Sequence, residues 1–457
     1  MPQTIRLRIR SPSPFNPTPD RNEFAATDQS MTSTIRRGPV FARLGICTLF
    51  GVVALIALRG DYPELQRIKI TFLDGGGGDF WAYYTAAVVV RGHQSASLYE
   101  ETDKRNVDPV EDYAAPGSVF AQTAEALGMS PVPMYDYPPM LADLLAPLAF
   151  VQPRTALDIW GILNMAAVFA SGILLSRLLG YDTVTADTTI VLCLLLFRPT
   201  LNNFQHAQPS AILLFLLLCG VYLYLKNRIF TAALMFSLAA AIKLTPLIVI
   251  VPLLAWRDWK ALRSFLFWGA TILAFLLAVN GPRALDRYFL HLLPQMARSF
   301  TDPENRGVVN ALQVLWQGTA MTPIISSFVW IGRTFSVAVV CTALWLCRNV
   351  RPATALPLST ARALFAFFLL AACISPVSWL HGFLLGAPTL AFGCLRIWER
   401  RASFIETAFV SLLAVSLSTY TFLRLEMLTP FFGVALCMME LQGLASFEDS
   451  RRDALTA

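Results

Sequence analysis

Residues 262–280 read LRSFLFWGATILAFLLAVN, a continuous apolar run that contains one charged residue. An α-helix needs about 20 such residues to cross a bilayer. Four further runs approach or exceed this length, at 41–59, 155–176, 322–347 and 403–424. Of all 457 residues 55% are apolar and only 14% are charged, which is too little charge for a soluble protein of this length. The sequence therefore predicts an all-α polytopic membrane protein.

Shorter apolar runs add to these five. Three are slightly shorter, and five more are too short to cross a membrane comfortably: 209–225, 378–395 and 428–444, then 138–152, 186–199, 229–242, 244–256 and 361–374. Together they predict a bundle of about 11–13 segments. A backbone break inside the membrane must be buried in protein or line a wet cavity, because lipid cannot satisfy its polar groups. Pro246, in Lys243-Leu244-Thr245-Pro246, cannot continue a helix, so we expect a helical hairpin beside a cavity there.

Charge sets the expected orientation. Residues 1–43 hold seven arginines and three acidic residues, whereas 61–137 hold twelve acidic and five basic residues. The positive-inside rule then predicts a cytoplasmic N-terminus and an extracytoplasmic loop at 61–137. We expect a disordered tail at 1–40, rich in Pro, Ser and Thr, a transmembrane domain at 41–445 and a polar tail at 446–457. The orientation of 138–199 stays open.

Several function classes lack their usual motifs. The eight cysteines lie in or at the ends of apolar runs, without the spacing of metal ligands. The glycines at 75–78 are not followed by Lys-Ser or Lys-Thr, so they do not form a nucleotide loop. These patterns imply no metal site and no cofactor, although metal dependence stays open. The arginine-bearing tail is explained more simply by membrane orientation, so we expect no nucleic-acid partner.

The run Asp79-Phe80-Trp81-Ala82-Tyr83-Tyr84 follows these glycines and starts the most informative motif. We expect a helix over 80–91 that stops at Gly92. Asp79 stands where a helix N-cap would. The same carboxylate, at the outer membrane surface, would also suit a general base. Both roles stay open from the local sequence.

Other polar residues interrupt the apolar runs. They include Gln205, His206 and Gln208, Lys243 at the helix break, and His381 in Ser375-Pro376-Val377-Ser378-Trp379-Leu380-His381. Ionisable groups at membrane depth usually face a cavity or a partner. Lys243 either meets an anion such as a phosphate or extends to a membrane interface. His381 is either a ligand or a satisfied packing residue.

In this order, the pieces resemble glycosyltransferase family 87, of the GT-C superfamily. The motifs are Asp79-Phe80-x-x-Tyr83-Tyr84, Tyr135-x-Tyr137-Pro138-Pro139, Gln205-x-x-Gln208, Ala241-Ile242-Lys243-Leu244-Thr245-Pro246 and Ser375-Pro376-x-Ser378-Trp379-x-His381. The similarity spans about 79–388. The sequence departs from the family where Ala207 replaces a usual glycine before Gln208, and where Gly382 replaces an aromatic residue or histidine.

The resemblance implies an integral membrane hexosyltransferase, typically a mannosyltransferase, that takes its sugar from a polyprenyl-phosphate donor. The acceptor would be the hydroxyl of a glycolipid, glycan or other molecule on the extracytoplasmic face of the cell membrane. Asp79 matches the family's catalytic base in an inverting transfer. Lys243 and His381 become candidates for binding the donor phosphate. The candidates for substrate binding are Tyr83, Tyr84, Tyr137, Gln205 and Gln208.

Two other classes remain possible from the residues. A transporter or flippase of a lipid-linked or small anionic solute would also use broken helices and a cavity lysine such as Lys243. It would favour inverted repeats, and the sequence shows no convincing internal duplication. A membrane scaffold without catalysis would leave the cavity-facing polar residues unexplained.

Overall fold

The computed structural model describes residues 78–100, 113–297, 305–316, 325–350, 357–418 and 425–456. All of them belong to the unit formed by residues 41–457. In these ranges the chain is helical, apart from turns and an isolated antiparallel bridge between Tyr113 and Pro133. The predicted all-α class is confirmed. The tail predicted at 1–40, the span at 41–59 and much of the 61–137 loop lie outside the described residues.

The elements of the first half surround the N-terminal motif and then form the first long helices. In chain order they are α4 (Phe80–Arg91), η1 (Ser95–Ser97), α5 (Val119–Ala126), α6 (Pro139–Leu145), η3 (Ala146–Phe150), α7 (Pro153–Leu178), α8 (Val184–Leu196), α9 (Arg198–Gln205), α10 (Ser210–Leu225) and α11 (Ile229–Ile242).

The second half continues through short helical turns and further long helices. These are η4 (Thr245–Val249), α12 (Ile250–Ala255), α13 (Trp259–Asp286), the π-helix η5 (Arg287–Leu292), α14 (Leu293–Met296), α15 (Val308–Trp316), α16 (Ile325–Cys347), α17 (Pro357–Ile374), η7 (Leu380–Gly386), α18 (Ala387–Trp398), α19 (Phe404–Ser418), η8 (Leu425–Leu428) and α20 (Thr429–Thr456). Helix α20 extends through most of the polar tail predicted at 446–457.

Six helical stretches of the described chain are long and apolar enough to cross a membrane. The bent pair α8 and α9, with an angle of 58° between them, makes a seventh if it is one span. Every apolar run predicted within the described residues is helical, either as one helix or as two successive helical elements. The run 361–374, expected to be too short, belongs to the 18-residue α17. Helix α17 begins four residues before the apolar run and includes Ser359 and Thr360. These polar residues are buried inside the protein, a tertiary effect that the hydropathy of the sequence does not predict.

The predicted helix break is present. Helix α11 ends at Ile242, Lys243 is extended with φ −149° and ψ 136°, and η4 begins at Thr245. Pro246 lies in the first turn of η4, where a missing backbone N–H costs no helical hydrogen bond. The chain therefore forms the expected hairpin, with Lys243 at the break between α11 and η4.

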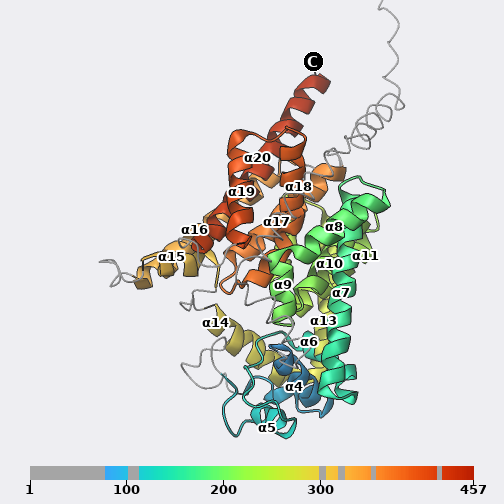
Figure 1. The fold of residues 1–457 in the computed structure, drawn as a ribbon, viewed down its shortest axis with the longest axis vertical. Coiled ribbons are helices and arrows are strands. Elements are labelled where there is room, and N and C mark those ends of the chain that lie inside the picture. Colours follow the sequence, from blue (N-terminus) through green and yellow to red (C-terminus); the bar gives the residue numbers. More distant parts are fainter. Residues whose placement is uncertain are drawn as a thin grey trace, which may run out of the picture. The chain divides into compact units, whose positions relative to one another are not determined.

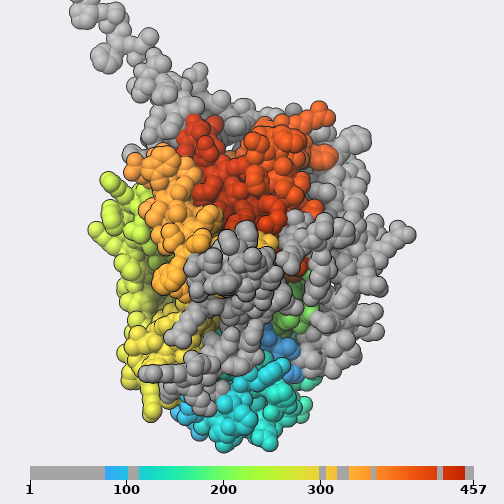
Figure 2. Space-filling model, turned by 90° about the vertical axis from the view of Figure 1, so that its left-hand side faces the viewer, coloured from blue at the N-terminus to red at the C-terminus, as the bar shows by residue number. Residues whose placement is uncertain are grey.

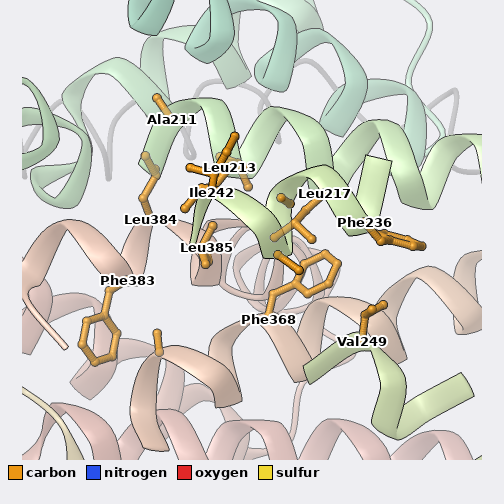
Figure 3. Close-up of a cluster of buried hydrophobic side chains, with 14 of the residues drawn as sticks. Ala211, Leu213, Leu217, Phe236, Ile242, Val249, Phe368, Phe383, Leu384 and Leu385 are labelled. Atoms are coloured by element: carbon orange, nitrogen blue, oxygen red, sulfur yellow. The ribbon is translucent and has the colours of Figure 1, made fainter. Parts of the chain in front are cut away.

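A dry core joins the two halves of this unit (Figure 3). Figure 3 shows side chains of this core from four elements: Leu217 of α10, Phe236 and Ile242 of α11, Phe368 of α17 and Leu385 of η7. Small residues allow some of these helices to approach closely. A side chain at Gly220 of α10, for example, would overlap the Phe236 ring.

The N-terminal motif lies at the other end of this unit from the C-terminal end of α20 (Figure 1). Helix α4 packs against α5, α6 and η3. Figure 2 shows the cyan residues around α5 at this end, beside the yellow residues of α13 and α14. The predicted helix over 80–91 and its stop at Gly92 are confirmed.

Candidate active site

A cavity of about 710 Å³ lies among α4, α9, η7, the α11–η4 break and α14. Its volume is in the range of small-molecule sites, roughly 300–1,000 Å³. Seven of the eight predicted site residues line it: Asp79, Tyr83, Tyr137, Gln205, Gln208, Lys243 and His381. Tyr84 does not, because its hydroxyl donates to the Val151 carbonyl at 2.6 Å and so holds α4 to the chain after η3.

Asp79 precedes α4 without capping it. Its side chain makes no cap hydrogen bond and instead accepts one from Nε2 of Gln208. The capping interpretation is therefore wrong. Gly78 has a φ of +49°, and a Cβ there would stand 3.3 Å from the His206 backbone. Glycine thus lets the start of α4 approach the segment that carries Gln208.

The environment of Asp79 changes its proton affinity. Burial raises the pKa of Asp79 from its ordinary value, while His206, the Gln208 hydrogen bond and Lys243 act in the opposite direction. A pKa moved upward towards the working pH suits a carboxylate that must accept a proton during a reaction.

The segment after α9 holds Gln208 in place. Ala207 has a φ of +51°, a left-handed conformation that glycine adopts without strain. This explains in physical terms why a glycine is usual at this position. Trp160 compensates by donating from its indole Nε1 to the Ala207 carbonyl at 2.6 Å. The turn thereby points Gln208 at Asp79.

Lys243 and Tyr137 lie together in the cavity. Nζ of Lys243 is 3.4 Å from the Tyr137 hydroxyl and 5.2 Å from the centre of its ring. A cation within about 6 Å of an aromatic face is attracted to the ring. The Tyr137 hydroxyl in turn donates to Oε1 of Gln208. The extended backbone at Lys243 therefore brings an ammonium group close to the Asp79 carboxylate.

Asp136 is a second carboxylate of the cavity that the sequence analysis missed. The pKa of Asp136 is raised to about 7, mainly by burial; Lys243 opposes this shift and Asp79 adds to it. The signal was present, because Asp136 is the variable position of the Tyr135-x-Tyr137 motif. The motif specifies Tyr135 and Tyr137 but leaves the residue between them open, so it does not mark Asp136.

Two arginines were missed as well. Arg198 and Arg306 line the cavity, together with His206. Nη1 of Arg306 donates to the Ser416 carbonyl at 3.1 Å, and its Nη2 lies 4.0 Å from Glu426. Arg306 belongs to no recognised motif, and only the tertiary fold brings it here.

The segment 375–381 completes the cavity wall. Asn305 binds it through Nδ2 to the Pro376 carbonyl at 2.9 Å and through Oδ1 to the Ser378 N–H at 2.9 Å. The His381 N–H donates to Oδ1 of Asn202 at 3.1 Å. These bonds attach the motif to helix α9 and to the segment just before α15, so the backbone around His381 is held in place.

His381 and Gln205 present unused polar atoms. His381 is buried, and neither ring nitrogen has a hydrogen-bond partner among the described residues. The interpretation as a satisfied packing histidine is therefore wrong. Oε1 of Gln205 is likewise buried without a partner in the described chain. Buried polar atoms without partners are costly, so a ligand that binds them would recover this free energy.

The chemistry of the cavity is that of carboxylates, cations and amides. Within the described ranges, no group of three or more His, Cys, Asp or Glu side chains is placed to hold a metal ion. The site can accept a proton at Asp79, bind an anion beside Lys243 and form hydrogen bonds to hydroxyl groups.

Comparison with known proteins gives consistent matches. The sequence model of glycosyltransferase family 87 matches residues 135–376. The chain is 27% identical over 308 residues to the polyprenol-phosphate-mannose-dependent alpha-(1-2)-phosphatidylinositol mannoside mannosyltransferase of Mycobacterium tuberculosis (strain ATCC 25618 / H37Rv), which covers 63% of this chain and 67% of the relative. No solved structure matches the chain.

Two further relatives are named polyprenol-phosphate-mannose-dependent alpha-(1-2)-phosphatidylinositol pentamannoside mannosyltransferases. The protein of Mycolicibacterium smegmatis is 29% identical over 166 residues, 36% of this chain and 39% of the relative. That of Mycobacterium tuberculosis (strain CDC 1551 / Oshkosh) is 26% identical over 272 residues, 58% of this chain and 59% of the relative. The chain thus spans less than two thirds of the length of these two relatives.

The family match covers more than half of the chain and includes Tyr137, Gln208 and Lys243, whereas Asp79 and His381 lie outside it. A match to a family of enzymes decides against the transporter and scaffold alternatives. The chain belongs to glycosyltransferase family 87 and is a membrane-embedded glycosyltransferase.

Proposed function

We propose that the protein transfers a mannosyl group from a polyprenol-phosphate-mannose donor to a hydroxyl group of a glycolipid. The printed names of its relatives support this donor and point to phosphatidylinositol mannosides as the acceptor class. The observation that carries the proposal is the shared cavity, in which the Asp79 carboxylate and the Lys243 ammonium are linked through Gln208 and Tyr137.

Asp79 acts as the general base in this proposal. The acceptor oxygen attacks C1 of the mannosyl group and forms the new glycosidic bond, while Asp79 takes its proton. The bond between C1 and the phosphate oxygen breaks, and its electron pair leaves with the polyprenyl phosphate. Attack from the face opposite the leaving group inverts C1.

Lys243 and His381 stabilise the leaving phosphate. The negative charge that develops on this group needs cations or hydrogen-bond donors that are already in place. Lys243 supplies an ammonium at the helix break, and His381 supplies unpartnered ring nitrogens. Gln205, Gln208, Tyr83 and Tyr137 are left to contact the hydroxyl groups and faces of the two sugars.

The reaction takes place at the extracytoplasmic face of the cell membrane. The supporting observation is the acidic composition of 61–137, which contains Asp79 and contrasts with the arginine-rich N-terminus. Both substrates are lipids, so they reach the cavity from the bilayer.

The test uses the purified full-length protein in liposomes, with polyprenol-phosphate-mannose labelled in the sugar and phosphatidylinositol mannosides as acceptor. Asp79→Asn keeps an oxygen that accepts from Gln208 but removes the base. Transfer should fall by about 10²–10⁴, the usual contribution of general base catalysis. Donor binding should persist, because the phosphate contacts lie elsewhere.

Asp143→Asn is the matched control. Asp143 accepts a hydrogen bond from Asn280 at 2.7 Å and does not line the cavity. Its substitution should leave turnover close to that of the unmodified protein. Full turnover by Asp79→Asn would reject the assignment of the base, and no labelled product from the unmodified protein would reject the substrates.

A further inference from the structure

We propose that Tyr137 and Gln208 are positioning residues that hold the Asp79 carboxylate ionised and aimed at the acceptor, with Lys243 setting the direction of their hydrogen bonds. The inference rests on the proposed role of Asp79 and extends it to residues for which we otherwise expect only sugar contacts. It concerns how the base is prepared before substrate arrives.

Three consecutive hydrogen bonds carry the inference. Nζ of Lys243 donates to the Tyr137 hydroxyl at 3.4 Å. The Tyr137 hydroxyl donates to Oε1 of Gln208, and Nε2 of Gln208 donates to Oδ2 of Asp79. The four residues come from four parts of the chain: the start of α4, the loop before α6, the turn after α9 and the α11–η4 break.

Lys243 and Asp79, at the two ends of this series of hydrogen bonds, fix the direction in which each hydrogen bond is donated. An ammonium group can only donate and an ionised carboxylate can only accept. Because Lys243 donates to the Tyr137 oxygen, the Tyr137 proton is free to point at Gln208. The carbonyl of Gln208 must then face Tyr137, and its NH₂ group must face Asp79. The amide of Gln208 is thereby held in one of its two orientations.

This orientation favours the ionised form of Asp79. The donor from Gln208 stabilises a negative charge on Oδ2. Oδ1 has no hydrogen-bond partner among the described residues, so it is available for the acceptor hydroxyl. If the amide were turned over, its carbonyl would face the carboxylate and favour the protonated form, which is not a base.

The surroundings make the arrangement rigid. Tyr137 is 6% exposed and Gln208 is 3% exposed. The Tyr137 ring lies edge-on to Tyr83, with their centres 5.1 Å apart, and under the Lys243 ammonium. Hydrogen bonds between such buried groups are stronger than in water, and leaving one of their partners unpaired is costly.

Several charged or titratable groups lie near Asp79. Lys243 and Tyr137 belong to the three hydrogen bonds, and His206, Asp136 and Tyr83 lie outside them. A substitution that tests the chain must therefore keep all of the charges. Tyr137→Phe does so, because it removes only a hydroxyl group.

The experiment measures kcat/KM for transfer against pH. In Tyr137→Phe the Gln208 amide can turn over and weaken its donation to Asp79. The pKa of Asp79 should then rise, so that activity is lost at a higher pH as the solution is acidified. We expect the acidic limb to move up by about one pH unit, the effect of losing a hydrogen bond to a charged group. KM for the donor should change little, because the ring and Lys243 remain.

Tyr135→Phe is the matched control. Tyr135 is buried two residues away, donates to the Pro138 carbonyl at 2.9 Å and accepts from the Ala142 N–H at 3.0 Å, but does not line the cavity. It should lose stability without a shift of the acidic limb. Equal limb shifts in the two variants, or none in Tyr137→Phe, would overturn the positioning role.

Gln208→Met tests the same hydrogen bonds if Tyr137→Phe does not fold. It removes the donor to Asp79 and keeps all of the charges, so the pKa of Asp79 should rise. The acidic limb should therefore move up at least as far as in Tyr137→Phe. An unshifted limb with a raised KM would instead make Gln208 a substrate contact. Asp79→Asn separates the two proposals. Turnover by this variant would reject Asp79 as the base. An inactive Asp79→Asn, together with unshifted acidic limbs in the Tyr137 and Gln208 variants, would reject only the positioning role.

Discussion

Asp136 places a titratable charge in a cavity where an anionic donor is proposed to bind. Its pKa is raised to about 7 by burial, so it is neutral below this pH and charged above it. The charged form repels a phosphate and competes for Lys243. The donor KM should therefore rise several-fold as the pH increases through about 7, and Asp136→Asn should remove most of this rise.

The measurement is the donor KM at a series of pH values for the unmodified protein, Asp136→Asn and Asp143→Asn. The last variant has the same substitution outside the cavity and should retain the unmodified pH dependence. An unaltered rise in Asp136→Asn would show that this carboxylate does not act on the donor.

At the residue scale, the sequence predicted the cavity residues that the motifs name, and it missed those at variable positions or outside the motifs, such as Asp136 and Arg306. Seven of eight predicted site residues line one cavity, because polar residues at membrane depth have few other favourable places. Tyr84 could not be separated from Tyr83, since adjacent helical positions differ only in the direction that tertiary packing gives them. Arg306 contacts Ser416 and Glu426, which are distant in sequence, so no local pattern places it in the cavity.

At the scale of elements, the contact of α10 with α11 depends on glycine at position 220, where α10 has no side chain. Gly220→Ala would place a methyl group against the buried Phe236 ring. Such overpacking typically costs about 1–3 kcal/mol, which outweighs the gain in helix propensity of about 1 kcal/mol. We expect a lower midpoint of thermal unfolding in detergent.

Gly269→Ala makes the same change within α13, where nothing lies within 4 Å of the new methyl group. It should leave stability unchanged or raise it slightly. Equal effects of the two substitutions would mean that helix propensity, and not the close approach, controls the result.

The helices themselves could be predicted because apolar runs and proline positions are local features. The break at Lys243 followed from Pro246 and is present. The bend between α8 and α9 did not follow, although Pro199 lies at the start of α9. A proline near a helix N-terminus is compatible with several chain directions, and packing selects one of them.

At the scale of the described unit, a buried charge network joins the last helices to α17. Arg362 of α17 binds Glu440 of α20 at 2.5 Å, and Arg396 of α18 lies 3.8 Å from Glu440 and 3.0 Å from Glu406 of α19. Removing one partner leaves a buried charge without compensation. Glu440→Ala should therefore lower the free energy of unfolding by about 3–5 kcal/mol.

Asp158→Ala is the control for this prediction. Asp158 pairs with Arg154 at 3.7 Å on an exposed face of α7, and such pairs contribute about 0–1 kcal/mol. Unfolding in detergent, followed by thermal denaturation, should separate the variants clearly. A Glu440→Ala protein as stable as Asp158→Ala would show that α18 to α20 are held by apolar packing alone.

The amide of Gln208 has a consequence for where the product proton goes. A hydroxyl or a carboxyl group can receive a proton on one side and release it on the other, but a primary amide keeps its NH₂ and C=O groups as they are. Gln208 therefore links Tyr137 to Asp79 by hydrogen bonds but does not relay a proton between them. In the proposed reaction, the proton taken by Asp79 therefore does not pass through Gln208 to Tyr137 and on to the departing phosphate. Another group beside Asp79, or water that enters the cavity, must take this proton before the next turnover.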